Sequence, residues 1–149
     1  MVVVTESETD EANIETADII SLSIPASHEF VRLARIGAAS IARRRGLSVR
    51  AIDDLRLAID ESFRILIGDP PIDGDDLPQA SALYGKVDVT FEVDDHELSV
   101  LLAGHFDGDE LVTDPEQLGH FEAVLADLVD RFEADATSKV VQFLSLIHI

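Results

Sequence analysis

Apolar residues at every second position mark the first predicted element. Residues 18–26, DIISLSIPA, place Ile20, Leu22 and Ile24 on one face and polar residues between them. This alternation is typical of a half-buried strand, and Pro25 is expected to end it because proline cannot donate to a strand ladder.

Two longer apolar runs flank the dipeptide Asp94-Asp95. Residues 84–93, YGKVDVTFEV, and 96–104, HELSVLLAG, both have strand-like composition, so the acidic pair between them predicts a hairpin turn. The second run is more uniformly apolar, which favours a central position in the sheet. Residues 137–143, TSKVVQF, predict a last strand.

Three other segments have helical spacing. Residues 27–45 begin with Ser27 and residues 48–67 begin with Ser48, and each serine is a possible N-cap. Residues 118–135, LGHFEAVLADLVDRFEAD, predict a third amphipathic helix. The short connection between the first two helices predicts that they pack side by side.

The element order predicts an α+β fold. Strand, helix, helix, strand, strand, loop, helix, strand is expected to form a two-layer α/β sandwich, with a mixed sheet of four or five strands and three helices on one face. The domain is expected to span residues 18–143. Residues 1–17 are acidic and aperiodic and predict a disordered tail. Residues 144–149, LSLIHI, can be encoded by a common transposon-adapter sequence, so we interpret them as an artefact, with an ordinary apolar strand end as the alternative.

Composition narrows the function classes. The 149 residues suit one domain, and 30 acidic against 11 basic residues give a net charge of −19. This charge disfavours nucleic acid and anionic membranes as partners and favours proteins with basic patches. The lack of cysteine excludes disulfides, thiolate metal sites and a cysteine nucleophile. Without a membrane-length apolar run or a signal peptide, we expect a cytoplasmic protein.

The stretch Gly46–Ser62, GLSVRAIDDLRLAIDES, resembles the anti-sigma-factor serine/threonine kinases, small members of the GHKL (histidine kinase/Hsp90-like) ATPase superfamily. The resemblance implies that Glu61 stands at the position of the catalytic general base. Four residues later the family has an asparagine that holds magnesium, on the same helix face as the glutamate. This chain has Ile65 there, and a hydrocarbon side chain offers no oxygen to magnesium.

The two glycine motifs of the family are also altered. Its D-x-G-x-G motif corresponds to AGHFDGD, where Gly104 replaces the adenine-binding aspartate and Phe106 replaces a glycine. A shifted register would let Asp107 and Gly108 supply an acid and a glycine. The phosphate-binding turn that opens the third helix reads QLGHF, in which Gly119 matches one family glycine.

The resemblance implies a regulator that binds a sigma factor, an anti-anti-sigma antagonist, or both. We expect a degenerate site without a cofactor; ATP with magnesium would bind only if the site still functions. The alternative is an active serine/threonine kinase that phosphorylates the antagonist, and a third hypothesis is an unrelated small α+β binding module. Family members often pair through their sheets, so the resemblance also allows a homodimer.

Arg32 and Arg35 are the candidate partner-binding residues. They lie three residues apart on one face of the first helix. By alignment back from Glu61, Arg35 falls where the family has an arginine that contacts sigma factor and antagonist. A guanidinium suits bidentate recognition of a carboxylate. Alternatively, both arginines only keep the helix soluble or pair with nearby acids.

Overall fold

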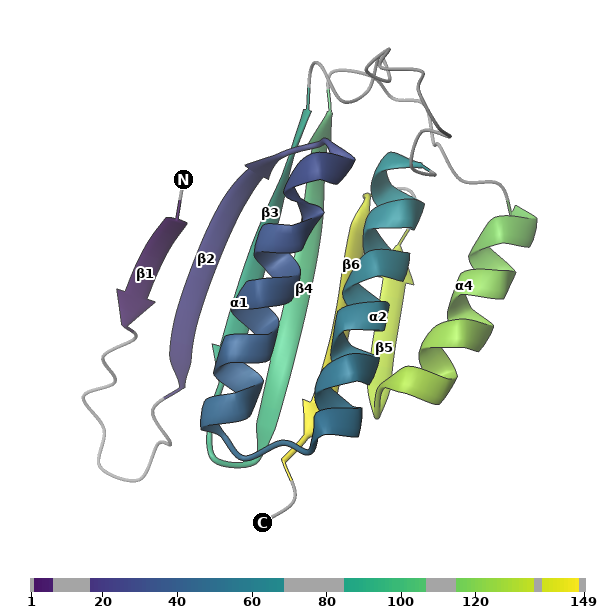
Figure 1. The fold of residues 1–149 in the computed structure, drawn as a ribbon. Coiled ribbons are helices and arrows are strands. Elements are labelled where there is room, and N and C mark those ends of the chain that lie inside the picture. The colour runs from purple at the N-terminus through teal and green to yellow at the C-terminus, as the bar shows by residue number, and fades with distance from the viewer. Residues whose placement is uncertain (1, 7–16, 69–84, 107–114, 136–137, 148–149) are drawn as a thin grey trace.

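The chain forms two layers, a twisted sheet and a layer of helices that covers one of its faces (Figure 1). The computed structural model describes residues 2–6, 17–68, 85–106, 115–135 and 138–147. This arrangement confirms the predicted α+β sandwich. No helix in these residues is both long and apolar enough to cross a membrane.

The sheet has six strands in the order β1-β2-β3-β4-β6-β5. All neighbouring strands are antiparallel, so the expectation of a mixed sheet was wrong. The reason lies in the connection after β2, where two antiparallel helices return the chain to the end that β2 has just reached. The next strand must therefore run the opposite way. The strands are β1 (Val2–Glu6), β2 (Asp18–Pro25), β3 (Gly85–Val93), β4 (Glu97–Phe106), β5 (Arg131–Asp135) and β6 (Val140–Leu146).

The central hairpin β3–β4 forms where the acidic dipeptide predicted a turn. Asp94 accepts hydrogen bonds through its carboxylate from the backbone N–H of His96 at 2.7 Å and of Glu97 at 2.8 Å. Such a local carboxylate bond holds the chain in a turn. It fixes the register in which Phe91 lies opposite Val100.

Three α-helices cover one face of the sheet, as predicted: α1 (Val31–Arg44), α2 (Val49–Ile67) and α4 (Pro115–Leu128). A 3₁₀ turn, His28–Phe30, precedes α1. Ser48 caps α2 by accepting a hydrogen bond from the N–H of Ala51 at 3.1 Å. Ser27, the other predicted cap, makes no such side-chain bond.

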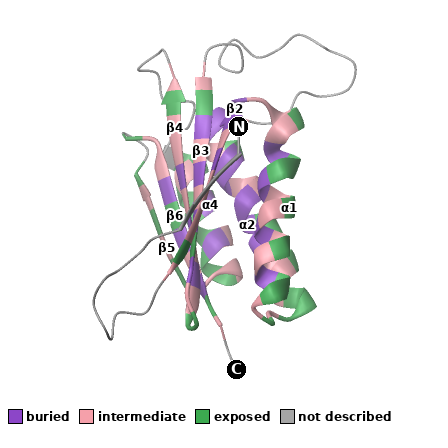
Figure 2. Cartoon of the chain, turned by 90° about the vertical axis from the view of Figure 1, so that its left-hand side faces the viewer, coloured by how far each residue is buried: buried purple, intermediate pink, exposed green. Residues whose placement is uncertain are grey.

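The core lies between the helices and the inner face of the central strands (Figure 2). Small residues of α1 are fully buried and let this helix approach the sheet closely, whereas α2 contributes larger side chains. A Cβ on Gly37 would lie only 3.4 Å from the ring of Phe91 in β3. The fully buried residues of α1 are Ala34, Ala38 and Ala42, and the largest of α2 are Leu55, Ile59 and Phe63.

Two edge strands were not predicted. Val2–Glu6 form β1 and pair with β2, so this part of the expected tail is ordered strand; β-branched residues occupy four of its five positions. Residues 7–16 lie outside the described residues. Leu144 to Leu146 continue β6, and the interpretation of residues 144–149 as an artefact stays a prediction.

The second unpredicted strand is β5, at the opposite edge. The third helix ends at Leu128, although we expected it to continue to residue 135. Phe132 continues the helical spacing of Phe121, Leu125 and Leu128, which explains the error. Asp130 anchors the turn instead, because its carboxylate accepts from the N–H of Leu146 at 2.7 Å and its own N–H donates to the carbonyl of Leu144 at 3.0 Å.

Candidate functional site

The predicted site residues gather at one end of the molecule. The chain direction puts the last turns of α2, the end of β4 and the first turns of α1 and α4 at this end (Figure 1). Glu61 and Ile65 belong to α2, Gly104 and Phe106 to β4, and Gly119 to α4. Asp107 and Gly108 lie outside the described residues, so the shifted-register hypothesis stays a prediction.

Glu61 already has a cationic neighbour. Its carboxylate lies 2.9 Å from Nη1 of Arg64, one turn later on α2, and its side chain is 19% exposed. A general base must be free to accept a proton from its substrate. Here the arginine donates a hydrogen bond to one of the two carboxylate oxygens.

Ile65 follows Glu61 by four residues and therefore lies on the same face of α2. Its side chain is half-buried and packs against the hydrophobic core. A hard cation such as magnesium requires oxygen ligands in near-octahedral geometry. The α2 face beside Glu61 supplies hydrocarbon at this position.

The end of β4 is covered by an aromatic ring. A Cβ on Gly104 would lie 2.5 Å from the ring of Phe106, and a Cβ on Gly85, which pairs with Phe106 across β3–β4, would lie 2.2 Å from it. The ring thus occupies the space over both glycines, and Nζ of Lys139 lies 5.0 Å from its centroid. An aspartate at position 104 would collide with the ring, so this space does not fit the adenine contact of the family.

We expected Gly119 in a turn that opens the third helix, but it lies inside that helix. The helix begins at Pro115, a favoured first helical residue because it lacks an N–H that would remain unpaired. Gly119 is therefore the fifth residue of α4. Only the first four N–H groups of a helix lack an internal partner, so the N–H of Gly119 is used within the helix.

Arg35 bridges the two long helices. Its Nη1 lies 3.2 Å from one carboxylate oxygen of Asp60 and 3.3 Å from the other. The two side chains are 36% and 33% exposed, so the pair lies at the surface of the α1–α2 seam. Arg32, the other predicted partner residue, is exposed. The structure thus contains the ion pair with a nearby acid that was one of the two interpretations of Arg35. A role toward a partner requires Arg35 to exchange Asp60 for a carboxylate of that partner.

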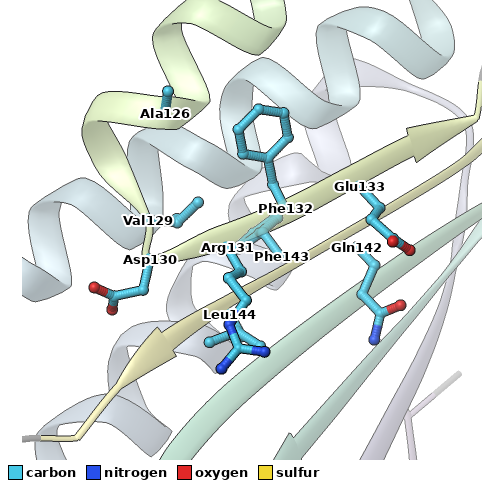
Figure 3. Close-up of a pocket in the computed structure, with 9 residues that line it drawn as sticks. All are labelled: Ala126, Val129, Asp130, Arg131, Phe132, Glu133, Gln142, Phe143 and Leu144. Atoms are coloured by element: carbon cyan, nitrogen blue, oxygen red, sulfur yellow. The ribbon is translucent and has the colours of Figure 1, made fainter.

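A hollow of about 500 Å³ lies elsewhere, between the end of α4 and strands β5 and β6 (Figure 3). Phe132 points from β5 toward α4, whereas Arg131 points the other way, beside Leu144. Neither Glu61 nor Arg35 lines this hollow. Its lining combines apolar side chains with Asp130, Arg131, Glu133 and Gln142, and we assign it no chemistry.

Sequence reasoning missed two features of the site. Sequence reasoning named no acid as the partner of Arg35, although Asp60 pairs with it across 25 positions of the chain. Phe106 was seen only as a replaced glycine, and its contact with Gly85 requires the strand register. The signal was present in part, since a glycine opposite an aromatic residue in a hairpin is a known way to cover bare backbone.

Sequence comparisons agree with the resemblance. No family model matches the chain. The serine-protein kinase RsbW of Listeria monocytogenes serotype 4a is 29% identical over 105 residues, which is 70% of this chain and 62% of the relative. The protein of the same name from Bacillus pumilus is 32% identical over 98 residues, 62% of this chain and 56% of the relative. That of Oceanobacillus iheyensis is 22% identical over 104 residues, 70% of this chain and 61% of the relative. The chain thus spans about three fifths of the length of these relatives. With the two-layer fold, these matches support the resemblance of the chain to the RsbW serine-protein kinases, which are of GHKL type.

Proposed function

We propose that this chain is an anti-sigma-factor-like regulator that acts by protein–protein binding and has a degenerate ATP site. On this proposal it sequesters a sigma factor, and an anti-anti-sigma antagonist releases that factor. The resemblance of Gly46–Ser62 to the anti-sigma-factor kinases supports this role, and the relatives of the chain are named serine-protein kinase RsbW.

One observation is the main support for a degenerate ATP site. The ring of Phe106 lies on Gly104, where the family places its adenine-binding aspartate. Ile65, in the place of the magnesium ligand, agrees with it. These residues do not fit magnesium-ATP, and we derive no phosphoryl-transfer step for the chain.

The second candidate function is an active serine kinase. The retained Glu61 and the names of the relatives favour it. The two functions differ in a direct assay. The purified chain is mixed with a sigma factor or antagonist encoded in the same genome, with and without magnesium-ATP. Nucleotide-independent complex formation without phosphate transfer supports the regulator. Transfer of phosphate to a serine of the antagonist would establish the kinase instead.

Arg35 gives the first mutational prediction. If its guanidinium binds a carboxylate of the partner, Arg35→Ala should weaken the complex by roughly 1–3 kcal/mol, the range for a hydrogen bond to a charged group. Arg35→Lys should restore only part of the affinity, because an ammonium cannot form two parallel bonds. The measurement is a titration of each variant against the sigma factor and the antagonist.

Asp60→Asn is the matched control, because it removes the intramolecular competitor of the partner. It should leave the affinity unchanged or raise it, since Arg35 no longer has to leave a charged neighbour. Equal losses of affinity in Arg35→Ala and Asp60→Asn would show that Arg35 acts only through the helix seam. Melting temperatures should change little in either variant, because a surface pair contributes about 1 kcal/mol or less.

A further inference from the structure

The basic residues of this acidic chain are concentrated in α1 and α2. Eight of its 11 Lys and Arg residues are arginines between positions 32 and 64. Only four acidic residues lie between the same two positions, which leaves a formal charge of +4 on this segment and −23 on the rest of the chain. The net charge of −19 therefore conceals a local surface of opposite sign. The four acids are Asp53, Asp54, Asp60 and Glu61.

Half of these arginines are paired within the chain and half are not. Arg35, Arg45, Arg56 and Arg64 each form an ion pair with an acidic side chain. The other four are exposed and form no ion pair within the part of the chain that the structure describes. In a chain with 30 acidic residues, such unpaired cations favour a carboxylate-bearing partner from outside. They are Arg32, Arg43, Arg44 and Arg50.

Large apolar side chains lie exposed among these arginines. Leu33 and Ile36 of α1 are 47% and 50% exposed, and Leu57 of α2 is 51% exposed. Leu33 and Ile36 lie on the side of α1 opposite its buried alanines, and Figure 2 shows exposed turns along this outer side. Leu57 precedes Asp60 by one turn, and the Arg35–Asp60 pair brings this part of α2 beside Ile36.

We call this surface the outer helix face and define it by Arg32, Leu33, Ile36, Arg43, Arg44 and Leu57. An apolar centre with arginines around it has the composition of a protein interface, in which aromatic, apolar and Arg residues are enriched. The stretch of α1 from Leu33 to Arg44 is about 16 Å long, at about 1.5 Å per residue, which matches three turns of an opposing helix.

We propose that the outer helix face docks an acidic amphipathic helix of a protein partner. The inference rests on the proposed function and adds to it the surface and the chemistry of the partner. Leucine-like side chains of that helix would cover Leu33, Ile36 and Leu57, and its carboxylates would pair with the free arginines.

The charge of the remaining chain selects this partner over a membrane or a nucleic acid. An extended anionic surface would also face the −23 charge of the other elements, and the repulsion would offset its attraction to the arginines. A single helix stays within the outer helix face. Acidic residues more than a Debye length of about 8 Å from it are largely screened at physiological salt and therefore repel it little.

The first test uses a designed probe and does not require the natural partner. The probe is a labelled 20-residue helical peptide with leucine on one face and glutamate on the other, titrated against the full chain. Arg43→Glu/Arg44→Glu should weaken its binding about tenfold, since each reversal replaces an attractive pair by a repulsive one. Ile36→Ser should also weaken binding. The matched control Lys86→Glu/Arg131→Glu makes the same charge change on the sheet and should leave the affinity unchanged.

Three results would overturn the proposal: no binding of the acidic peptide by the wild-type chain, equal weakening by the control, or stronger binding to anionic phosphatidylserine vesicles than to the peptide. Self-association that Ile36→Ser abolishes would also overturn it, because a second copy would then cover the face.

The second test applies the same variants to the sigma factor and antagonist of the same genome. Weaker binding of either protein by Arg43→Glu/Arg44→Glu alone supports the inference. Equal binding by wild type and variants would overturn the inference while the proposed function stands. Peptide binding at the outer helix face without binding of either protein would reject the proposed function and leave the docking chemistry supported.

Discussion

Calorimetry with ATP and magnesium is expected to detect no binding to this chain at micromolar concentrations. Ile65 supplies no oxygen to the metal, and Gly104 has no side chain that could accept a hydrogen bond from adenine. The ring of Phe106 also fills the space over Gly104. The proposed loss of ATP binding rests on these three residues.

Restoring the three family residues is the stronger form of this prediction. The triple variant Ile65→Asn/Gly104→Asp/Phe106→Gly should gain magnesium-dependent ATP binding, because it returns the metal ligand and the acid and removes the ring that collides with the acid. Gly104→Asp alone should not gain binding, and it should lower stability, since a Cβ at this position would lie 2.5 Å from the Phe106 ring. Circular dichroism controls for folding of each variant.

Two outcomes would contradict the degenerate site. Micromolar binding of magnesium-ATP by the wild-type chain would mean that other groups hold the nucleotide, with Asp107 as the first candidate. The active-kinase function would then be favoured. A folded triple variant without any ATP binding would mean that the loss of the site involves more than these three positions.

Periodicity predicted most of the fold because the central elements carry strong patterns. β3 alternates apolar and polar residues, β4 is a mostly apolar run, and α1 and α2 have an apolar stripe at helical spacing, so local sequence and burial agree. The edge strands were missed for the opposite reason. β5 is only five residues long and has a half-buried phenylalanine that continues the spacing of α4.

The resemblance supplied Glu61 and Ile65 as candidate positions, and helix spacing predicted that the two share one helix face. Both lie in α2, four residues apart, and their roles stay a prediction. The Arg35–Asp60 pair and the cover of Gly85 by Phe106 join residues that are distant in sequence or on different strands. A single sequence gives no information on such pairs until the packing of α1 on α2 and the β3–β4 register are known.

The largest stability effect is expected at Phe91. Phe91→Ala should lower the free energy of unfolding by about 3–5 kcal/mol, the usual loss for a buried phenylalanine. The ring is fully buried in β3, and Leu22 of β2 and Gly37 of α1 lie close to the same space. Alanine would leave a cavity between the two layers, because the close-packed neighbours of the ring relax only partly into the space.

Urea denaturation followed by circular dichroism measures this loss, and two variants serve as controls. Phe132→Ala removes the same ring from the half-buried edge strand β5 and should cost clearly less, because part of that side chain is already in contact with solvent. Phe91→Leu should cost less than Phe91→Ala, because leucine fills part of the cavity. Equal losses at positions 91 and 132 would contradict a core centred under α1. Because Gly37 of α1 lies beside the Phe91 ring, the loss at position 91 should be accompanied by faster amide hydrogen exchange in α1.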